Sequence, residues 1–288
     1  MIECAVAAGN ILGEGPVWDT EAGVLYWLDI KQPRLHRYQP SGGSVRSWDL
    51  PNQPGSLAVR ERGGLLLALD SGFAFFDPET SELTPLADPE PDRPGNRFND
   101  GKTDRRGRFW AGSMDDEELE WTGALYRFDP DGTWHRLLDG LGIPNTLAWS
   151  PGGETMYFAE TLEQTIYTFM FDAVAGEISG RRVFATTKEE DCYPDGSTVD
   201  AEGFLWNAQF NGWRLVRYAP DGSVNRVVEM PVQNPTSCMF GGEDLDVLYV
   251  TSARKGLAEA ALEDQPLAGG LFAFDVGVAG LPETPFSG

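Results

Sequence analysis

Histidine and cysteine are scarce in this sequence, with 2 His and 3 Cys among 288 residues. Cys4, Cys192 and Cys238 are far apart, odd in number and without the spacing of a zinc site, which predicts reduced cysteines with packing roles. His36 and His135 are the only histidines, and both fall on patterns typical of outer strands. A Gly-x-Ser-x-Gly motif is also missing. The sequence therefore disfavours a serine or cysteine nucleophile activated by histidine.

Long apolar runs and basic residues are few. The most apolar stretch, GGLLLALDSGFAFF, is interrupted by Asp70 and is too short to cross a membrane. Twenty-two Lys and Arg face 45 Asp and Glu, a net charge of -23, which disfavours nucleic acid and anionic membranes as partners. The first residues, MIECAVAAGN, lack the basic start and long apolar segment of a signal peptide. We therefore expect a cytoplasmic protein, and a monomer.

What the sequence does contain is a repeat of short apolar strands. The strands LYWLD, LLALD, FWAGS, MYFAE, LWNAQ and LYVTS start at intervals of 41 to 49 residues. Asp-Pro and Asp-Gly turns follow many of them, and no long helical period is present, which indicates antiparallel β-structure. Repeats of this length are typical of propeller blades. The sequence predicts one all-β domain over residues 1–288, a six-bladed β-propeller, with IECAVAA pairing with the last blade.

Polar residues recur at one position of this repeat, near the start of the strand that precedes each apolar strand. The six equivalent residues are Glu14, Gly55, Asn99, Asn145, Asp195 and Pro235. In a propeller such positions lie on one ring around the axis, so four of these side chains should converge. Buried carboxylates repel each other unless a cation or a shared proton relieves them, and oxygen ligands suit a divalent ion. The alternative is that these are unrelated turn residues, since Asp and Asn favour turns.

The sequence resembles the gluconolactonase/regucalcin family, also called the senescence-marker-protein family, and within it the bacterial sugar-lactone hydrolases. The resemblance is carried by LGEGPVWD at 12–19, NRFNDGKTDRRGRFWAGSM at 96–114, YPDGSTVDAEGFLW at 193–206, TSARKGL at 251–257 and PLAGGLFAF at 266–274. It extends along essentially the whole chain. It implies a six-bladed propeller with one divalent metal ion on its axis, which could be Ca, Zn, Mn, Mg or Fe.

The resemblance also implies roles for individual residues. It makes Glu14, Asn145 and Asp195 the metal ligands and Asp195 the catalytic acid and base. The ligands of the substrate's oxygen atoms would be Arg97 and Asn99, and the acidic loop 115–120 would contribute Glu120. One departure is Thr146, which follows Asn145 where many relatives have glycine and could crowd its neighbours.

The function that these residues favour is metal-dependent hydrolysis of an aldonolactone to the aldonic acid, with the small-molecule lactone as the partner. Two alternatives stay open: an organophosphate-hydrolysing relative, and a calcium-binding regulator without turnover. Arg97 and Asn99 suit a polyol better than an apolar ester. The acidic loop 115–120 is interpreted as a solvated loop, with a lid over the pocket as the alternative. Lys255 could face the pocket mouth.

Overall fold

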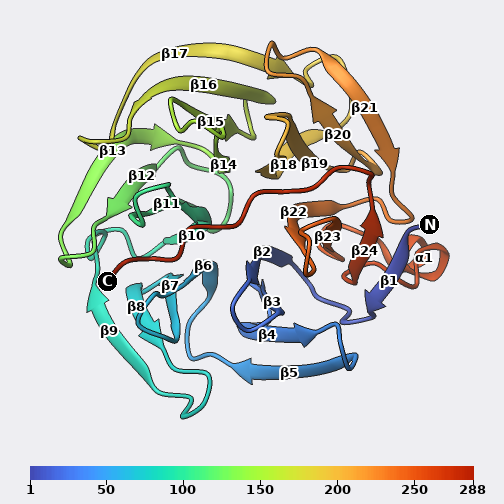
Figure 1. The fold of residues 1–288 in the computed structure, drawn as a ribbon, viewed down its shortest axis with the longest axis horizontal. Helices are drawn as coiled ribbons and strands as arrows, with labels where there is room; N and C mark the ends of the chain where they lie inside the picture. Colours follow the sequence, from blue (N-terminus) through green and yellow to red (C-terminus); the bar gives the residue numbers. More distant parts are fainter.

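The computed structural model describes residues 1–288 and consists of six four-stranded antiparallel sheets around a central axis (Figure 1). The predicted all-β, six-bladed propeller is confirmed. Each sheet is one blade, and its first strand lies next to the axis. In the last blade the order from the axis outward is β22, β23, β24 and β1. The N-terminal strand therefore closes the ring, as the sequence predicts for IECAVAA.

The strands of the first three blades have the following bounds. Blade 1 contains β2 (Gly13–Asp19), β3 (Val24–Asp29), β4 (Arg34–Gln39) and β5 (Ser44–Asp49). Blade 2 contains β6 (Pro54–Val59), β7 (Leu65–Leu69), β8 (Gly72–Phe76) and β9 (Leu83–Ala87). Blade 3 contains β10 (Asn96–Thr103), β11 (Phe109–Asp115), β12 (Gly123–Phe128) and β13 (Trp134–Leu141).

The remaining blades complete the circle. Blade 4 contains β14 (Pro144–Trp149), β15 (Thr155–Glu160), β16 (Thr165–Asp172) and β17 (Glu177–Thr186). Blade 5 contains β18 (Tyr193–Val199), β19 (Leu205–Phe210), β20 (Arg214–Tyr218) and β21 (Val224–Glu229). Blade 6 contains β22 (Pro235–Gly241), β23 (Val247–Ser252), β24 (Leu271–Asp275) and β1 (Glu3–Val6). The helix α1 (Glu259–Asp264) links β23 to β24, and no helix is long and apolar enough to span a membrane.

Tryptophans on the second strand of alternate blades pack between the sheets. Trp27, Trp110 and Trp206 are completely buried. The indole nitrogens of Trp110 and Trp206 donate hydrogen bonds to Asp104 Oδ2 (3.0 Å) and Asp200 Oδ2 (2.9 Å), the residues that directly follow β10 and β18. The repeated six-residue spacing from Asp to Trp thus fixes the far end of an innermost strand to its neighbour, because a buried indole N–H needs a partner.

All six innermost strands are irregular near the residue that the repeat aligns. The pairing register shifts at Glu14/Val17, Pro54/Ser56, Phe98/Gly101, Asn145/Ala148, Pro194/Ser197 and Pro235/Ser237. A bulge leaves a residue unpaired and changes the direction of its side chain, which is a frequent device beside functional sites. Here it occurs in every blade at the level of the predicted ring.

The C-terminal segment, residues 279–288, crosses the end of the axis that lies opposite the predicted ring (Figure 1). We call this segment the strap. Gly280 N donates to Leu245 O (2.8 Å) on blade 6, and Phe286 N donates to Val59 O (2.8 Å) on blade 2. Phe286 is buried between blades 2 and 3, stacked on Phe128. The strap thereby joins blades that lie on different sides of the ring.

Candidate active site

The starts of four innermost strands surround a cavity of about 310 Å³ at the other end of the axis. Its floor is formed by Glu14 of β2, Asn99 of β10, Asn145 of β14 and Asp195 of β18, which are between 3% and 6% exposed. The sequence places these residues on one ring, and the structure brings them together in one cavity. The equivalent positions Gly55 and Pro235 contribute no side-chain oxygen.

A second layer of the cavity comes from residues two positions earlier in the same chain segments. These residues are Leu12, Arg97, Ile143 and Tyr193. Alternate residues of a strand point to the same side, so the residue two before a floor residue lies above it. Sequence reasoning found Arg97 but missed the other three, which the same two-residue step would have identified. The rim is completed by Glu118, Thr161, Leu162, Phe210 and Lys255.

The floor holds two buried carboxylates that no arginine or lysine neutralises. Neither Glu14 nor Asp195 forms a salt bridge, although Arg97 and Lys255 line the same cavity. Burial, followed by the charge of Asp100, raises the pKa of Glu14 to about 8. Burial, followed by the charge of Glu14, raises the pKa of Asp195 well above its usual value. Such a pair is costly when both groups are ionised, so this floor attracts either protons or a cation.

The amide of Asn145 is held so that its oxygen remains on the side of the cavity facing Asn99. Its Nδ2 donates to Thr161 Oγ1 (2.9 Å), and its Oδ1 accepts a hydrogen bond from Asn99 Nδ2 (3.1 Å). No three His, Cys, Asp or Glu side chains form a metal site by themselves. The donor set at this floor is therefore two carboxylates and one amide oxygen, which fits a hard divalent ion. Glu14, Asn145 and Asp195 are the residues that would hold it.

Arg97 stands beside this floor as a buried, fixed donor. Its Nε donates to Asp116 Oδ1 (2.7 Å), and its Nη1 donates to Phe98 O (2.9 Å) and Asn99 Oδ1 (2.8 Å). Nη2 makes no hydrogen bond within the protein, although the residue is only 3% exposed. The guanidinium can thus offer both Nη2 protons to the oxygen atoms of a ligand.

Residues 12–254 match the profile of the SMP-30/Gluconolactonase/LRE-like region. The chain belongs to this family. It is 38% identical to the L-arabinolactonase of Azospirillum brasilense over 97% of this chain and 93% of that one. It is 36% identical to the 6-deoxy-6-sulfogluconolactonase of Pseudomonas putida over 100% and 99%. Among solved structures, regucalcin of Agrobacterium tumefaciens, described as a calcium-binding protein, has a TM-score of 0.95 at 32% identity, over 98% of this chain and 96% of that one.

The family resemblance stated from the sequence is thereby confirmed, and the structure explains the departure at Thr146. Thr146 has a φ of 59°, the left-handed conformation in which glycine is unstrained and a β-branched residue is not. Its hydroxyl donates to Asp195 O (2.5 Å) and lies 3.0 Å from Ser197 Oγ. Instead of crowding the site, Thr146 connects the strand of Asn145 to the strand of Asp195.

The acidic loop between β11 and β12 places a different glutamate at the cavity than the sequence suggests. Glu120 is exposed and does not line the cavity, whereas Glu118 does. The Asp115 carboxylate accepts the backbone N–H groups of Leu119 (2.9 Å) and Glu120 (3.0 Å), and Glu118 has a φ of 61°. This tight turn directs Glu118 inward and Glu120 outward, so Glu120 has no contact that supports a role in binding.

The same loop is exposed at Glu117, Leu119 and Glu120, as expected of a solvated loop, but it is anchored at Asp116 and Glu118. Glu118 forms an ion pair with Lys255, from the segment after β23, and Lys255 lines the mouth as the sequence suggested. Asp116 accepts hydrogen bonds from Arg97 and from Lys31 Nζ (2.5 Å) of blade 1. The loop therefore ties blades 1, 3 and 6 together at the mouth.

The histidines and Cys192 lie outside this cavity: His36 and Cys192 are buried in the packing, and His135 is exposed beside Asp129. His36 stacks on Trp27 with ring centroids 4.7 Å apart, and burial lowers its pKa to about 4. Burial raises the pKa of the Cys192 thiol. The sequence shows no cation beside Cys192, but Arg214 Nη2 lies 3.5 Å from its sulfur, a contact that only the fold creates.

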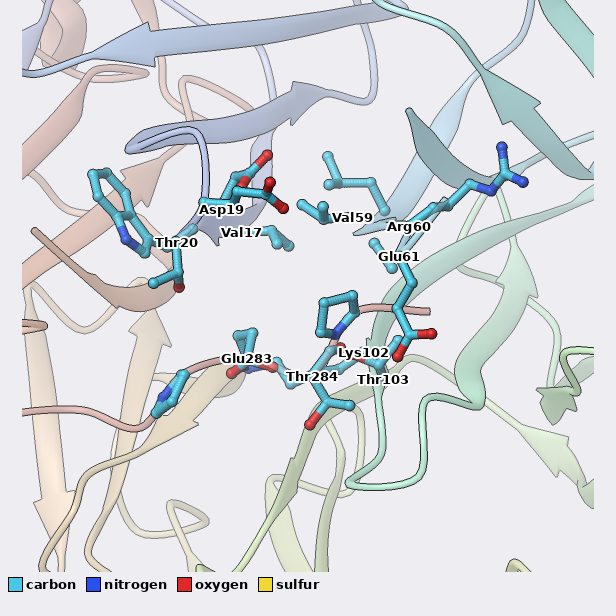
Figure 2. Close-up of a pocket in the computed structure, with 16 residues that line it drawn as sticks. Val17, Asp19, Thr20, Val59, Arg60, Glu61, Lys102, Thr103, Glu283 and Thr284 are labelled. Carbon is cyan, nitrogen blue, oxygen red and sulfur yellow. Dashed lines mark hydrogen bonds and ion pairs between the residues drawn. The ribbon is translucent and has the colours of Figure 1, made fainter. Parts of the chain in front are cut away.

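A larger cavity, about 460 Å³, lies at the opposite end of the axis between the ends of β2, β6 and β10 and the strap (Figure 2). Lys102 lies within it, donates to Ser197 O (2.9 Å) and pairs with Glu283 of the strap at 3.8 Å. This central lysine is thus already satisfied by the protein. The unpaired carboxylates are at the other end, which identifies the smaller cavity as the candidate active site.

Proposed function

We propose that the protein is a sugar lactonase that hydrolyses an aldonolactone to the aldonic acid with the help of one divalent metal ion. The observation that carries this proposal is the convergence of two unpaired, buried carboxylates and an amide oxygen beside the free Nη2 of Arg97. The relatives named L-arabinolactonase and 6-deoxy-6-sulfogluconolactonase support the substrate class.

Each step of the reaction can be assigned to a residue of the cavity. Arg97 Nη2 holds an oxygen of the lactone and fixes the ring above Asn99. The Asp195 carboxylate accepts a proton from the attacking water as its oxygen bonds to the carbonyl carbon. The carbon–oxygen bond of the ring then breaks, and Asp195 returns that proton to the departing ring oxygen. The products are a hydroxyl group and a carboxylic acid, with no other reactant required.

The metal would be held by Glu14, Asn145 and Asp195. When bound, a divalent ion supplies a Lewis acid for the carbonyl and lowers the pKa of water beside it. It would also remove the repulsion between Glu14 and Asp195, leaving Asp195 ionised and able to act as a base. Which divalent ion is used depends on supply as well as on these oxygen ligands.

The test is a pH-stat assay with a panel of pentonic and hexonic γ- and δ-lactones, with and without divalent ions. We expect turnover that a chelator abolishes and that several divalent ions restore in part. Full activity after chelation would contradict the metal, and faster turnover of phosphotriesters than of any lactone would favour an organophosphate hydrolase. Metal binding without turnover of either substrate class would leave the calcium-binding function of the regucalcin neighbour as the better description.

A further inference from the structure

The candidate cavity has two chemically different sides above its floor. One side carries the charged residues Arg97, Glu118 and Lys255 together with the apolar Leu12. The other carries Ile143 and Leu162 of the segments flanking β14 and β15, and Phe210 at the end of β19. These three residues belong to blades 4 and 5, which are neighbours in the ring (Figure 1). We call them the apolar wall.

The apolar wall is held in place by a buried carboxylate that does not itself line the cavity. Glu160, which is 3% exposed, accepts the backbone N–H groups of Gly142 (2.9 Å), Ile143 (2.8 Å) and Leu162 (3.3 Å). Phe210 packs against the buried cluster that contains Leu12. A wall fixed by backbone hydrogen bonds and packing keeps its shape, so it can select among ligands.

This side of the cavity offers few partners for a ligand hydroxyl. Thr161 also lines it, but its hydroxyl donates to Pro194 O (2.8 Å) and accepts from Asn145 Nδ2 (2.9 Å), so its proton is already used. Ile143, Leu162 and Phe210 have no polar side-chain atoms. Tyr193 supplies the one hydroxyl that makes no hydrogen bond within the protein. A fully hydroxylated sugar would therefore place at least one hydroxyl group against the apolar side chains of this wall.

We propose that the apolar wall receives a terminal methyl group, and that the preferred substrates are terminal-deoxy aldonolactones. This inference rests on the proposed lactonase function and specifies its substrate. The ring oxygen atoms of the lactone lie toward Arg97 and Asn99, and the carbon that lacks a hydroxyl packs on Ile143, Leu162 and Phe210. The charged and apolar sides then each contact the part of the substrate that matches them.

The expected selectivity follows from the cost of removing a hydroxyl from water without replacing its hydrogen bonds. An apolar pocket rejects an added hydroxyl by no more than about a hundredfold, and the partly open rim reduces this, since Leu162 is 38% exposed. We expect kcat/KM to be about tenfold higher for the deoxy lactone of a matched pair.

The experiment compares pairs of γ-lactones that differ in one hydroxyl and share every configuration. L-fucono-lactone is paired with L-galactono-lactone, and L-rhamnono-lactone with L-mannono-lactone, with kcat/KM measured by pH-stat for the metal-loaded protein. The Leu162→Gln variant adds hydrogen-bonding groups to the wall and should lower the deoxy preference to about one. Val174→Gln is the matched control, because Val174 is 81% exposed in the turn between β16 and β17, away from the cavity. It should keep the wild-type preference.

Equal or higher kcat/KM for the hydroxylated lactones overturns the inference while leaving the lactonase function standing. The same holds if Leu162→Gln keeps the full deoxy preference while remaining folded by thermal unfolding. Calorimetric titration with the free sugars, L-fucose against L-galactose, gives a readout that needs no turnover. If no lactone is hydrolysed, the proposed function fails, and tighter binding of L-fucose would still support the wall's preference. Equal binding would overturn it as well.

Discussion

The Nε atom of Arg97 lies 2.7 Å from Asp116 Oδ1, and this bond fixes the one cation that is buried at the candidate active site. Asp116 belongs to the acidic loop. Its Oδ1 also accepts a hydrogen bond from Lys31 of blade 1, and its Oδ2 accepts one from Gln53 of the segment between blades 1 and 2. The loop thus determines where the free Nη2 of Arg97 points.

Removing the charge of Asp116 should therefore weaken substrate binding more than the chemical step. For Asp116→Asn we expect kcat/KM for the lactone to fall by about tenfold to a hundredfold, mainly through KM, because a misplaced positioning group costs on this scale. Metal content should not change. The exposed neighbour Glu117 provides a control in Glu117→Gln, which should behave as wild type. A fall confined to kcat, or an equal effect of both substitutions, would argue against the positioning role.

The hydroxyl of Thr146 should contribute more to the free energy of unfolding than the packing of its methyl group. Thr146→Val keeps the shape and the strained φ but removes the donor to Asp195 O, so we expect a loss of about 1–3 kcal/mol in the free energy of unfolding. Thr146→Ser keeps the donor and should retain most of the stability. Denaturant unfolding of both variants measures this difference. If the Thr146→Val and Thr146→Ser variants are equally stable, the hydrogen bond from Thr146 to Asp195 O does not contribute to stability.

Acid should destabilise the protein through His36, which does not line the cavity. Burial lowers its folded-state pKa from 6.5 to about 4, so the folded protein binds fewer protons than the unfolded chain between these values. The stabilising contribution is present above pH 6.5 and is lost as the pH falls through 4, for a total of about 3 kcal/mol. His36→Gln should show a weaker dependence of thermal stability on pH over this interval. An unchanged dependence would remove His36 as a cause.

Metal binding should compete with protons at the floor. In metal-free protein the pKa of Glu14 is raised from 4.5 to about 8, so its folded-state contribution is present at low pH and lost as the pH rises through 8. With chelator, the melting temperature should therefore fall as the pH rises from 6.5 to 8, above the range in which His36 titrates. With a divalent ion this loss should disappear, and the apparent Kd should decrease with rising pH because binding releases protons. An affinity that is independent of pH would contradict this.

The ring of floor residues could be predicted because equivalent positions of a repeat occupy equivalent positions in the structure. Once Glu14, Asn99, Asn145 and Asp195 share a register, a propeller necessarily brings them to its axis. The apolar wall was harder to predict, because Leu162 lies in a connection and Phe210 at the very end of β19, where the orientation of a side chain depends on packing. The exchange of Glu120 for Glu118 has a similar cause, since a left-handed residue and an Asp115 cap redirect the loop.

The strap and the contact of Arg214 with Cys192 also escaped the sequence analysis. Both join segments that no repeat relates. Residues 279–288 have no strand pattern, and their path across the ring is set by single contacts such as the burial of Phe286. Pattern reasoning identifies what recurs, and these contacts occur once.

The central claim is that Asp195 both binds the metal and carries the proton, whereas Asn145 only binds. The most direct measurement is metal analysis together with lactone kinetics for Asp195→Asn, with Arg97→Ala beside it. Asp195→Asn keeps an oxygen ligand but has no base, so it should retain some metal and lose on the order of 10²–10⁴ in kcat. Arg97→Ala should keep its metal and lose mainly kcat/KM. An Asp195→Asn variant that binds metal and hydrolyses the lactone at close to the wild-type rate would contradict the account.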